Sequence, residues 1–268
     1  MRNKIFKVAC FQTKSSNLPE ENIDLLSKMF SKIKNNSIEL VCLPECVAIF
    51  SDSRDQINNY LNQWNDKFLK FISDQAHKNR TFILIGSLPA KSKNNKFLNR
   101  SLLISSSGRI ISFYDKINLF DVVLNKNEKY LESKNYNAGR YLKIADLPWG
   151  KLGMSICYDI RFPNLYKKLA SRGADFVSVP AAFTYTTGKA HWHSLIRARA
   201  IENGCFVFAP AQLGYHKNGR RTFGHSMIVN PWGEILKEAK EENSIIFEKI
   251  DVSLVSEVRK KIPSTTKY

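Results

Sequence analysis

The segment KLGMSICYDIRFP, Lys151 to Pro163, carries an apolar run that ends on Cys157 and is followed at once by polar residues. A cysteine that only fills a core needs no polar neighbours, whereas a nucleophile needs groups that activate it. The N–H groups at the start of a following helix would favour a thiolate at this position. A cysteine at the end of an apolar strand is nevertheless more often a packing residue, so this segment alone leaves both interpretations open.

Strand-like and helix-like segments alternate on both sides of this segment. Amphipathic periodicity predicts helices over residues 19–36, 55–79, 162–173 and 189–204. Turn residues predict hairpins at Ser107–Gly108, Trp149–Gly150 and Pro231–Gly233. Most strand segments are apolar at most positions, which indicates cover on both faces. The sequence therefore predicts an α/β fold with two mixed sheets packed face to face and helices outside, and we expect a single domain over residues 1–268.

The composition is that of a globular protein, with 43% hydrophobic and 24% charged residues among 268. No apolar run approaches the length of a transmembrane helix. The first residues, MRNKIFKVACFQT, alternate apolar and polar side chains and lack the uninterrupted apolar core of a signal peptide. We therefore expect a cytoplasmic protein that does not bind a membrane.

The formal net charge of +17 raises the question of a nucleic-acid partner. The lysines are spread along the chain and mixed with asparagine, as in SKIKNN and KSKNNK, and no nucleic-acid-binding motif accompanies them. Solvated surface lysines explain this pattern better than a nucleic-acid interface. An acidic small substrate would also suit a positive field.

The cysteine and histidine spacing does not predict a metal site. The five cysteines are scattered singly, at positions 10, 42, 46, 157 and 205. His191 and His193 stand two apart on a predicted helix, so they do not face the same side. We expect reduced thiols, no metal and no cofactor.

Three reactive side chains follow predicted strands. Glu45 ends VCLPE, Lys116 lies in FYDKINLF, and Cys157 ends GMSIC. Strand ends of an α/β sheet are where functional groups converge. The carboxylate could take the thiol proton, the ammonium could stabilise an oxyanion, and the thiolate could attack a carbonyl carbon. Each residue alone also has an ordinary structural explanation.

The three segments LPE, YDKINLFDV and GMSICYDIRFP, in this order, resemble the signature segments of the nitrilase superfamily, which are carbon–nitrogen hydrolases with a Glu–Lys–Cys triad. The resemblance covers nearly the whole chain. The later segments RARAIEN, AQLGYH and FGHSMIVNPWG are most similar to the deaminated-glutathione amidases of the Nit branch. The omega-amidases, which act on short α-keto acid amides, are near relatives.

The resemblance implies a role for each matching residue. Glu45 corresponds to the general base, Cys157 to the nucleophile, and Lys116 to the ammonium that stabilises the tetrahedral intermediate. Glu132 in YLESKN matches a second glutamate that holds the lysine and orients the substrate amine or water. Tyr158 would contribute its backbone N–H to the oxyanion hole.

The resemblance also implies the architecture and the reaction. The expected fold is a four-layer α-β-β-α sandwich, assembled as a homodimer or a higher homo-oligomer. The expected reaction is cofactor-independent hydrolysis of a small-molecule amide that carries carboxylates, with release of ammonia and a cysteine thioester as intermediate. Deaminated glutathione is the favoured substrate, and an omega-amidase activity is the alternative.

Several residues around the nucleophile could contact substrate. Arg161, four residues after Cys157, could bind a substrate carboxylate, or it could pair with Asp159 or with a neighbouring subunit. Three threonines after the next predicted strand could also shape the substrate site: Thr184, Thr186 and Thr187.

Two features depart from the pattern of the family. Asp115 and Asn118 stand where relatives commonly carry an arginine and a histidine, and the tail IPSTTKY is short. Asp115 could pair with Lys116, or it could point to the opposite face of the strand. These departures motivate a second hypothesis, a catalytically weak binding protein built on the same fold.

Overall fold

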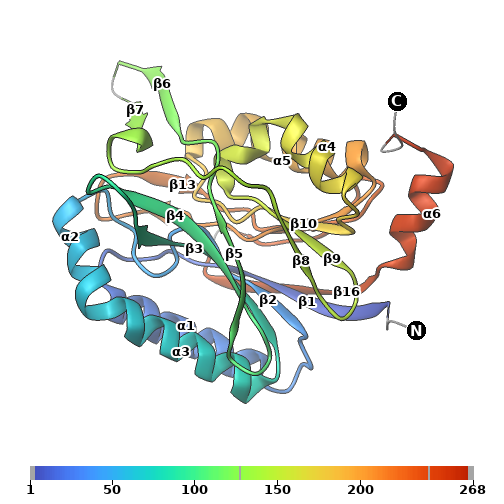
Figure 1. Ribbon diagram of the computed structural model, residues 1–268, viewed down its shortest axis with the longest axis horizontal. Helices are drawn as coiled ribbons and strands as arrows, with labels where there is room; N and C mark the ends of the chain where they lie inside the picture. The colour runs from blue at the N-terminus through green and yellow to red at the C-terminus, as the bar shows by residue number, and fades with distance from the viewer. Residues whose placement is uncertain (1–3, 127, 241, 265–268) are drawn as a thin grey trace.

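Two six-stranded sheets pack face to face in the computed structural model, which describes residues 4–126, 128–240 and 242–264 (Figure 1). The first sheet has the order β16-β1-β2-β3-β4-β5 and consists of β1 (Ile5–Gln12), β2 (Leu40–Cys42), β3 (Phe82–Lys91), β4 (Phe97–Ile104), β5 (Ile110–Asp115) and β16 (Ser244–Asp251). The second has the order β15-β14-β11-β10-β9-β8 and consists of β8 (Lys143–Asp146), β9 (Lys151–Met154), β10 (Phe176–Ser178), β11 (Phe206–Ala209), β14 (Met227–Val229) and β15 (Ile235–Glu238). In each sheet three neighbouring strands pair in parallel, β1, β2 and β3 in the first and β9, β10 and β11 in the second, and every other pairing is antiparallel.

Helices cover the outer face of each sheet (Figure 1). The first sheet is covered by α1 (Pro19–Ile33) and α3 (Asn65–Asn79), and the second by α4 (Pro163–Ser171) and α5 (Tyr185–Asn203). Outside the layers lie α2 (Arg54–Asn59) and the C-terminal α6 (Ser253–Lys261). The four-layer α-β-β-α sandwich expected from the sequence is confirmed.

The helix predicted over residues 55–79 is interrupted by a π-helical turn. The segment η1 (Tyr60–Trp64) joins α2 to α3 without a break in helical backbone. The Tyr60 ring is fully buried there, whereas the residues around it are mostly exposed. Periodicity in the sequence detects the helical stretch but not the extra residue that widens one turn.

Aromatic rings fill the space between the two sheets. Phe6 of β1 stacks on Trp149, which lies in the turn between β8 and β9, with ring centroids 4.5 Å apart. Phe176 of β10 and Phe208 of β11 meet the same Phe6 ring at 5.4 and 6.2 Å. Such contacts across the layers fix the two sheets against each other. A site built from the strand ends of both sheets is thereby held rigidly.

Two short hairpins, which the sequence pattern did not predict, lie outside the main sheets. One pairs β6 (Asp121–Asn125) with β7 (Glu128–Leu131), and it projects from the molecule in Figure 1. The other pairs β12 (Leu213–Tyr215) with β13 (Arg221–Phe223). Both have exposed or half-buried residues at many positions, so they lack the apolar runs that identify buried strands.

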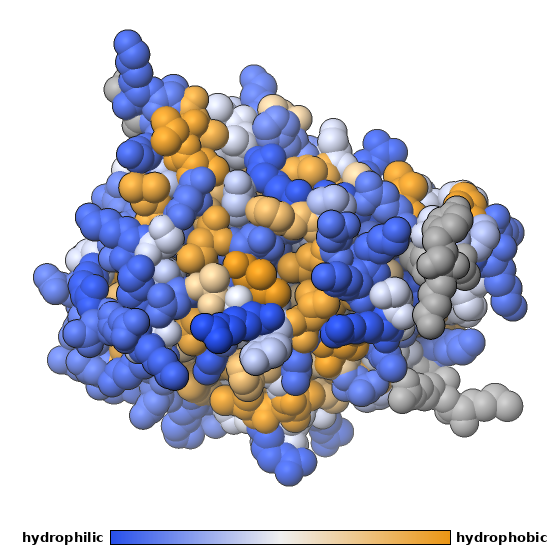
Figure 2. Space-filling model, turned by 45° about the horizontal axis from the view of Figure 1, so that its top comes forward, coloured by the Kyte–Doolittle hydropathy of each residue, from blue (hydrophilic) through white to orange (hydrophobic). Residues whose placement is uncertain are grey.

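Apolar side chains remain exposed on the edge strand β5, which lies beside the edge strand β8 of the other sheet (Figure 1). Ile110, Ile111 and Phe113 each expose between 45% and 54% of their surface. Figure 2 shows hydrophobic residues gathered in a band across one face of the molecule, between hydrophilic margins. Contiguous apolar surface of this kind often mediates contact with another chain.

In the part of the chain that the structure describes, no helix combines the length and apolarity needed to cross a bilayer.

Glu45 is positioned by close backbone packing between its loop and β3. The Ser87 N–H donates to the carbonyl of Pro44 at 3.3 Å, and the Cys46 N–H donates to Ser87 Oγ at 2.9 Å. A Cβ atom on Gly86 would lie 2.0 Å from the carbonyl oxygen of Leu43. Only glycine therefore permits this approach.

We predict that Gly86→Ala lowers the free energy of unfolding by about 2 kcal/mol or more, because the contacting atoms belong to backbone and cannot rotate away. Gly153→Ala is the matched control, since its new Cβ would meet only side-chain atoms, at 3.1 Å or more. Urea denaturation of both variants provides the measurement. Equal losses for the two variants would contradict the proposed backbone constraint.

Candidate active site

The side chains of Glu45, Lys116, Glu132 and Cys157 converge on one cavity of about 460 Å³. Glu45 follows β2 and Lys116 follows β5, so both come from the ends of strands in the first sheet. Cys157 follows β9 of the second sheet and opens the 3-10 helix η3 (Cys157–Arg161). Glu132 opens the 3-10 helix η2 (Glu132–Lys134), directly after β7. The two sheets and the β6–β7 hairpin thus each contribute to the same site.

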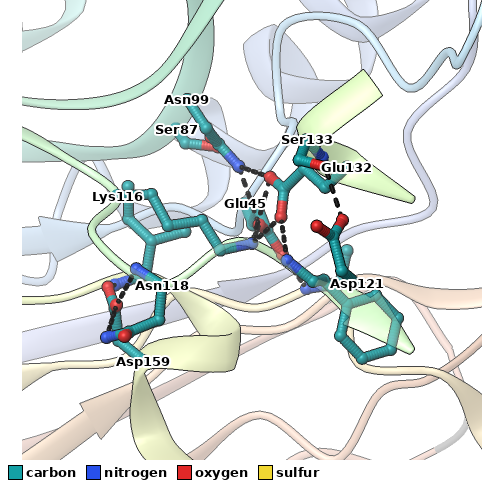
Figure 3. A network of polar contacts seen from close by, with 12 residues as sticks. Glu45, Ser87, Asn99, Lys116, Asn118, Asp121, Glu132, Ser133 and Asp159 are labelled. Atoms are coloured by element: carbon teal, nitrogen blue, oxygen red, sulfur yellow. Dashed lines mark hydrogen bonds and ion pairs between the residues drawn. The ribbon is translucent and has the colours of Figure 1, made fainter. Parts of the chain in front are cut away.

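Lys116 lies between the two carboxylates (Figure 3). Its Nζ donates to Glu45 Oε1 at 3.0 Å and to Glu132 Oε2 and Oε1 at 2.9 and 3.2 Å. Burial alone would lower the pKa of Lys116, but the charges of Glu132 and Glu45 outweigh it and raise the pKa well above its usual value. The side chain is therefore a fixed ammonium ion at every physiological pH.

Asn99 of β4 joins the same network, although the sequence did not single it out. Its Nδ2 donates to Glu45 Oε1 and to Glu132 Oε1, both at 3.0 Å (Figure 3). Glu132 Oε2 accepts a further bond from the Phe120 N–H at 2.7 Å. The two carboxylates are thus held by neutral donors as well as by the ammonium, and this fixes their orientation.

Glu45 and Cys157 line the same cavity and influence each other's ionisation. Glu45 Oε2 accepts a hydrogen bond from the Ala182 N–H at 2.7 Å. Burial alone would raise the pKa of Glu45, but the charge and hydrogen bond of Lys116 and the neighbouring Cys157 thiol outweigh it and lower the pKa. Glu45 is therefore ionised and can accept a proton.

The thiol of Cys157 is neutral at rest. Burial and the negative charge of Glu45 raise its pKa well above the usual value, although Lys116 acts in the opposite direction. The thiol proton consequently stays on sulfur until an electrophile is attacked, and the Glu45 carboxylate is placed to receive it. This geometry supports general-base activation of a thiol rather than a preformed thiolate.

Cys157 has a backbone conformation that is uncommon for a residue with a side chain. Its φ is +47°, in the left-handed region. The Cys157 N–H donates to the Pro180 carbonyl at 2.9 Å, which ties this turn to the segment after β10. Strained residues of this kind cluster at functional sites. Tyr158 is the next residue of η3, where the first N–H groups of a helix lack partners within the helix.

Asp159 connects the turn of Cys157 to the segment of Lys116. It is fully buried and accepts hydrogen bonds from Tyr114 OH at 2.8 Å and from the Ile156 N–H at 2.9 Å. Asn118 donates to it twice, from its backbone N–H at 2.9 Å and from Nδ2 at 2.8 Å (Figure 3). Asn118 thus has a defined positioning role between the segments that carry Lys116 and Cys157.

Asp115 points away from the cavity, as strand alternation allows. Its carboxylate forms a paired contact with Arg100, from Nε at 2.7 Å and Nη2 at 2.9 Å. It therefore does not compete with Glu45 or Glu132 for Lys116.

Arg161 does not pair with Asp159, whose oxygens are occupied by other donors. Its Nη2 lies 3.3 Å from His191 Nδ1, and its guanidinium faces the Phe183 ring at 5.2 Å. Arg161 is also absent from the lining of the cavity. Its predicted contact with a substrate carboxylate finds no support in this geometry.

The threonines also lie apart from the cavity lining. Thr184 directly precedes α5, and Thr187 lies in the first turn of this helix. Both side chains are buried, and their hydroxyl groups form a hydrogen bond of 2.7 Å with each other. Thr186 is exposed and donates to Glu128 Oε2 at 3.1 Å. The expected loop is thus a helix start, and the predicted substrate contacts of Thr184 and Thr187 are likewise without support.

Arg220 lines the cavity, although no sequence pattern singled it out. It lies in the turn between β12 and β13, within the polar stretch HKNGRR, where no periodic pattern marks it. Asn99 was missed for a different reason. It is a polar residue within the apolar strand segment FLNRSLLI, and this contrast with its neighbours was the signal that could have identified it.

One cluster outside the cavity has metal-ligand chemistry. His193 Nε2 and His225 Nδ1 lie 2.9 and 2.7 Å from Glu238 Oε1, and the three ligand atoms are within 4.8 Å of one another. Hydrogen bonds between the imidazoles and the carboxylate already account for this arrangement. The absence of a metal and a cofactor stays a prediction.

We predict that Glu45→Gln changes thiol reactivity and turnover in opposite directions. Removing the carboxylate charge lowers the pKa of Cys157, so labelling by iodoacetamide at pH 8 becomes faster. Turnover falls by about 100- to 10,000-fold because the proton acceptor is lost. Peptide mass spectrometry identifies the labelled thiol. Cys205, whose pKa burial raises to about 12, provides an internal control. Slower labelling of Cys157 in the variant would contradict the assigned influence of Glu45 on this thiol.

Asn118→Ala should lower the free energy of unfolding by about 1–2 kcal/mol, because one donor to the buried carboxylate of Asp159 is lost while the others remain. Tyr114→Phe removes a different donor to the same carboxylate and should cost a similar amount. Thermal or urea denaturation measures both changes. Stability unchanged in both variants would show that Asp159 does not depend on these donors.

Comparison with known proteins agrees with this architecture. The family model described as carbon-nitrogen hydrolase matches residues 7–260. Proteins named "Deaminated glutathione amidase" from Dictyostelium discoideum and Yersinia enterocolitica are 39% and 38% identical, with 98% and 96% of this chain and 94% and 90% of those proteins covered. The crystal structure of the C. elegans NitFhit protein superposes with a TM-score of 0.93 at 34% identity, covering 98% of this chain and 65% of that one.

Saccharomyces cerevisiae Nit3, described as a member of branch 10 of the nitrilase superfamily, has a TM-score of 0.86 at 29% identity, with 99% of this chain and 97% of that one covered. The fold, the order of the three motif segments and the family match over most of the sequence all agree. This chain belongs to the carbon–nitrogen hydrolase family, within the nitrilase superfamily that its motifs resemble.

Proposed function

We propose that this carbon–nitrogen hydrolase is an amidase that acts through Cys157, Glu45 and Lys116, with deaminated glutathione as its substrate. The observation that carries the proposal is a buried thiol, an ionised carboxylate and a fixed ammonium that line one cavity, with the ammonium hydrogen-bonded to the carboxylate. The choice of substrate rests on the names of the relatives from Dictyostelium discoideum and Yersinia enterocolitica.

In the first half of the reaction, Cys157 Sγ attacks the amide carbonyl carbon and its proton passes to Glu45. The carbonyl oxygen becomes an oxyanion, which the Lys116 ammonium and the Tyr158 N–H stabilise. Glu45 then gives the proton to the amide nitrogen, the C–N bond breaks, and the amine leaves. The acyl group remains on sulfur as a thioester.

In the second half, a water molecule attacks the thioester carbon and gives a proton to Glu45. The C–S bond breaks, the acid leaves, and the proton returns to Cys157. Glu132 keeps Lys116 in place and orients the amine or the water. The expected release of ammonia applies only to a primary amide. Deaminated glutathione is a secondary amide, so the amine that leaves is cysteinylglycine.

A second candidate is an omega-amidase that acts on 2-oxoglutaramate. The chain is also 36% identical to the "Probable hydrolase nit2" of Schizosaccharomyces pombe and 34% identical to "Nitrilase homolog 2" of Dictyostelium discoideum. Both substrates would leave the same 2-oxoglutaryl group on Cys157.

The single-domain organisation, the cytoplasmic location and a homodimer or higher homo-oligomer also stay predictions.

The test compares deaminated glutathione with 2-oxoglutaramate by measuring the released 2-oxoglutarate. We expect kcat/KM to be at least tenfold higher for deaminated glutathione, and Cys157→Ala to hydrolyse neither compound. The reverse preference would identify an omega-amidase. No turnover of either compound by the wild type, together with labelling of Cys157 no faster than that of Cys10 or Cys205, would favour the catalytically weak binding protein.

A further inference from the structure

We propose that Arg220 binds a carboxylate on the acyl part of the substrate, and so makes the enzyme selective for amides of short dicarboxylic acids. This inference rests on the proposed amidase function and deepens it. The residue was assigned no role by the sequence motifs, and it lies in a turn far from the three motif segments in the chain. In the fold it lines the same cavity as Cys157 and Glu45.

The guanidinium of Arg220 is incompletely used within the protein. Its Nη2 donates to the Ala182 carbonyl at 3.0 Å, whereas its Nε is buried and has no hydrogen-bond partner among the described residues. No carboxylate of those residues lies within 4.0 Å of it. A buried donor without an acceptor is unfavourable, and it is commonly satisfied by a ligand at a functional site.

The acids that line the cavity are already held by other groups. Glu45 and Glu132 are bound by Lys116 and Asn99. Asp52, at the same cavity, accepts a hydrogen bond from Asn218 Nδ2 at 2.7 Å. Burial alone would lower the pKa of Arg220, but the charges of Asp52 and Glu45 raise it, although neither carboxylate lies within ion-pair distance of the guanidinium. Among the described residues the guanidinium therefore has no ion-pair partner, and a substrate carboxylate can supply the missing acceptor.

Aromatic rings surround the guanidinium. Its Cζ lies 4.9 Å from the centre of the Tyr130 ring, 5.6 Å from that of Phe50 and 5.9 Å from that of Phe120. These rings limit the rotamers of Arg220 and reduce its access to water. A carboxylate that binds there makes stronger hydrogen bonds than it would on the solvated surface.

The backbone of Ala182 connects Arg220 to Glu45, the proposed base. The Ala182 N–H donates to Glu45 Oε2, and the Ala182 carbonyl accepts from Arg220 Nη2. The guanidinium is consequently held at a fixed position relative to the reacting groups. A rigid subsite of this type measures the length of chain between the scissile carbonyl and the carboxylate. Glutaryl and 2-oxoglutaryl, the acyl groups of the proposed substrates and their analogues, carry such a carboxylate.

The test uses two primary amides with the same carbon chain. Glutaramate carries a carboxylate at the end of its acyl chain, and pentanamide carries a methyl group in its place. For Arg220→Gln we expect the ratio of kcat/KM for glutaramate to that for pentanamide to fall by about a hundredfold. For Arg220→Lys, which keeps the positive charge but loses the two parallel donors of the guanidinium, this ratio should fall less.

Arg221→Gln is the matched control. This neighbouring guanidinium stacks on Tyr185 and Tyr215, at 3.4 and 4.7 Å, and does not line the cavity. Its substitution should leave the ratio unchanged. A parallel loss of activity on both amides in Arg220→Gln, with the ratio preserved, would show a purely structural role and overturn the proposal while the amidase function stands.

A binding readout separates this inference from the proposed function. Glutarate should protect Cys157 of the wild type from iodoacetamide, and the concentration for half protection should rise at least tenfold in Arg220→Gln. If the wild type hydrolyses no amide, this measurement still tests the subsite. Equal protection in the two proteins would refute carboxylate binding by Arg220.

Discussion

The ammonium of Lys116 between Glu45 and Glu132 is the interaction on which the rest of the site depends. Removing these charges from water is costly, so each must be compensated by close partners with good geometry. Lys116 satisfies both carboxylates at 3.0 and 2.9 Å, and Asn99 bridges them from another strand. The ends of β2 and β5 and the start of η2 are thereby tied together. The remaining negative charge keeps the nearby thiol protonated until substrate arrives.

The fold was largely predictable because buried strands and amphipathic helices have strong local patterns. The convergence of Glu45, Lys116 and Cys157 followed from their places at strand ends, whereas Glu132 depended on the resemblance to a family. Its hairpin, β6–β7, is short and half exposed, so no local pattern marks it. Arg220 could not be found in this way, because its place at the cavity arises from tertiary contacts with residues distant in the chain, such as Ala182, Tyr130 and Phe50.

The two departures in the lysine segment become intelligible in the structure, whereas the last four residues of the short tail lie outside the described residues. Asp115 faces away from the cavity and is neutralised by Arg100, so it leaves the charge of Lys116 undisturbed. Asn118 supplies two donors to the buried Asp159, and this holds the turn of Cys157 against the segment of Lys116. The hypothesis of a weakly catalytic binding protein was motivated in part by Asp115. That motivation is removed by the side-chain geometry.

The charge balance of the cavity also connects substrate recognition with catalysis. Arg220 is among the groups that lower the pKa of Glu45, although the Lys116 charge has the larger effect. A substrate carboxylate bound to Arg220 offsets that positive charge, so the pKa of Glu45 rises while the complex forms. The Glu45 carboxylate then becomes a stronger base when the Cys157 thiol must lose its proton. An uncharged amide would leave Arg220 uncompensated and Glu45 less basic, so recognition of the carboxylate favours both binding and the chemical step.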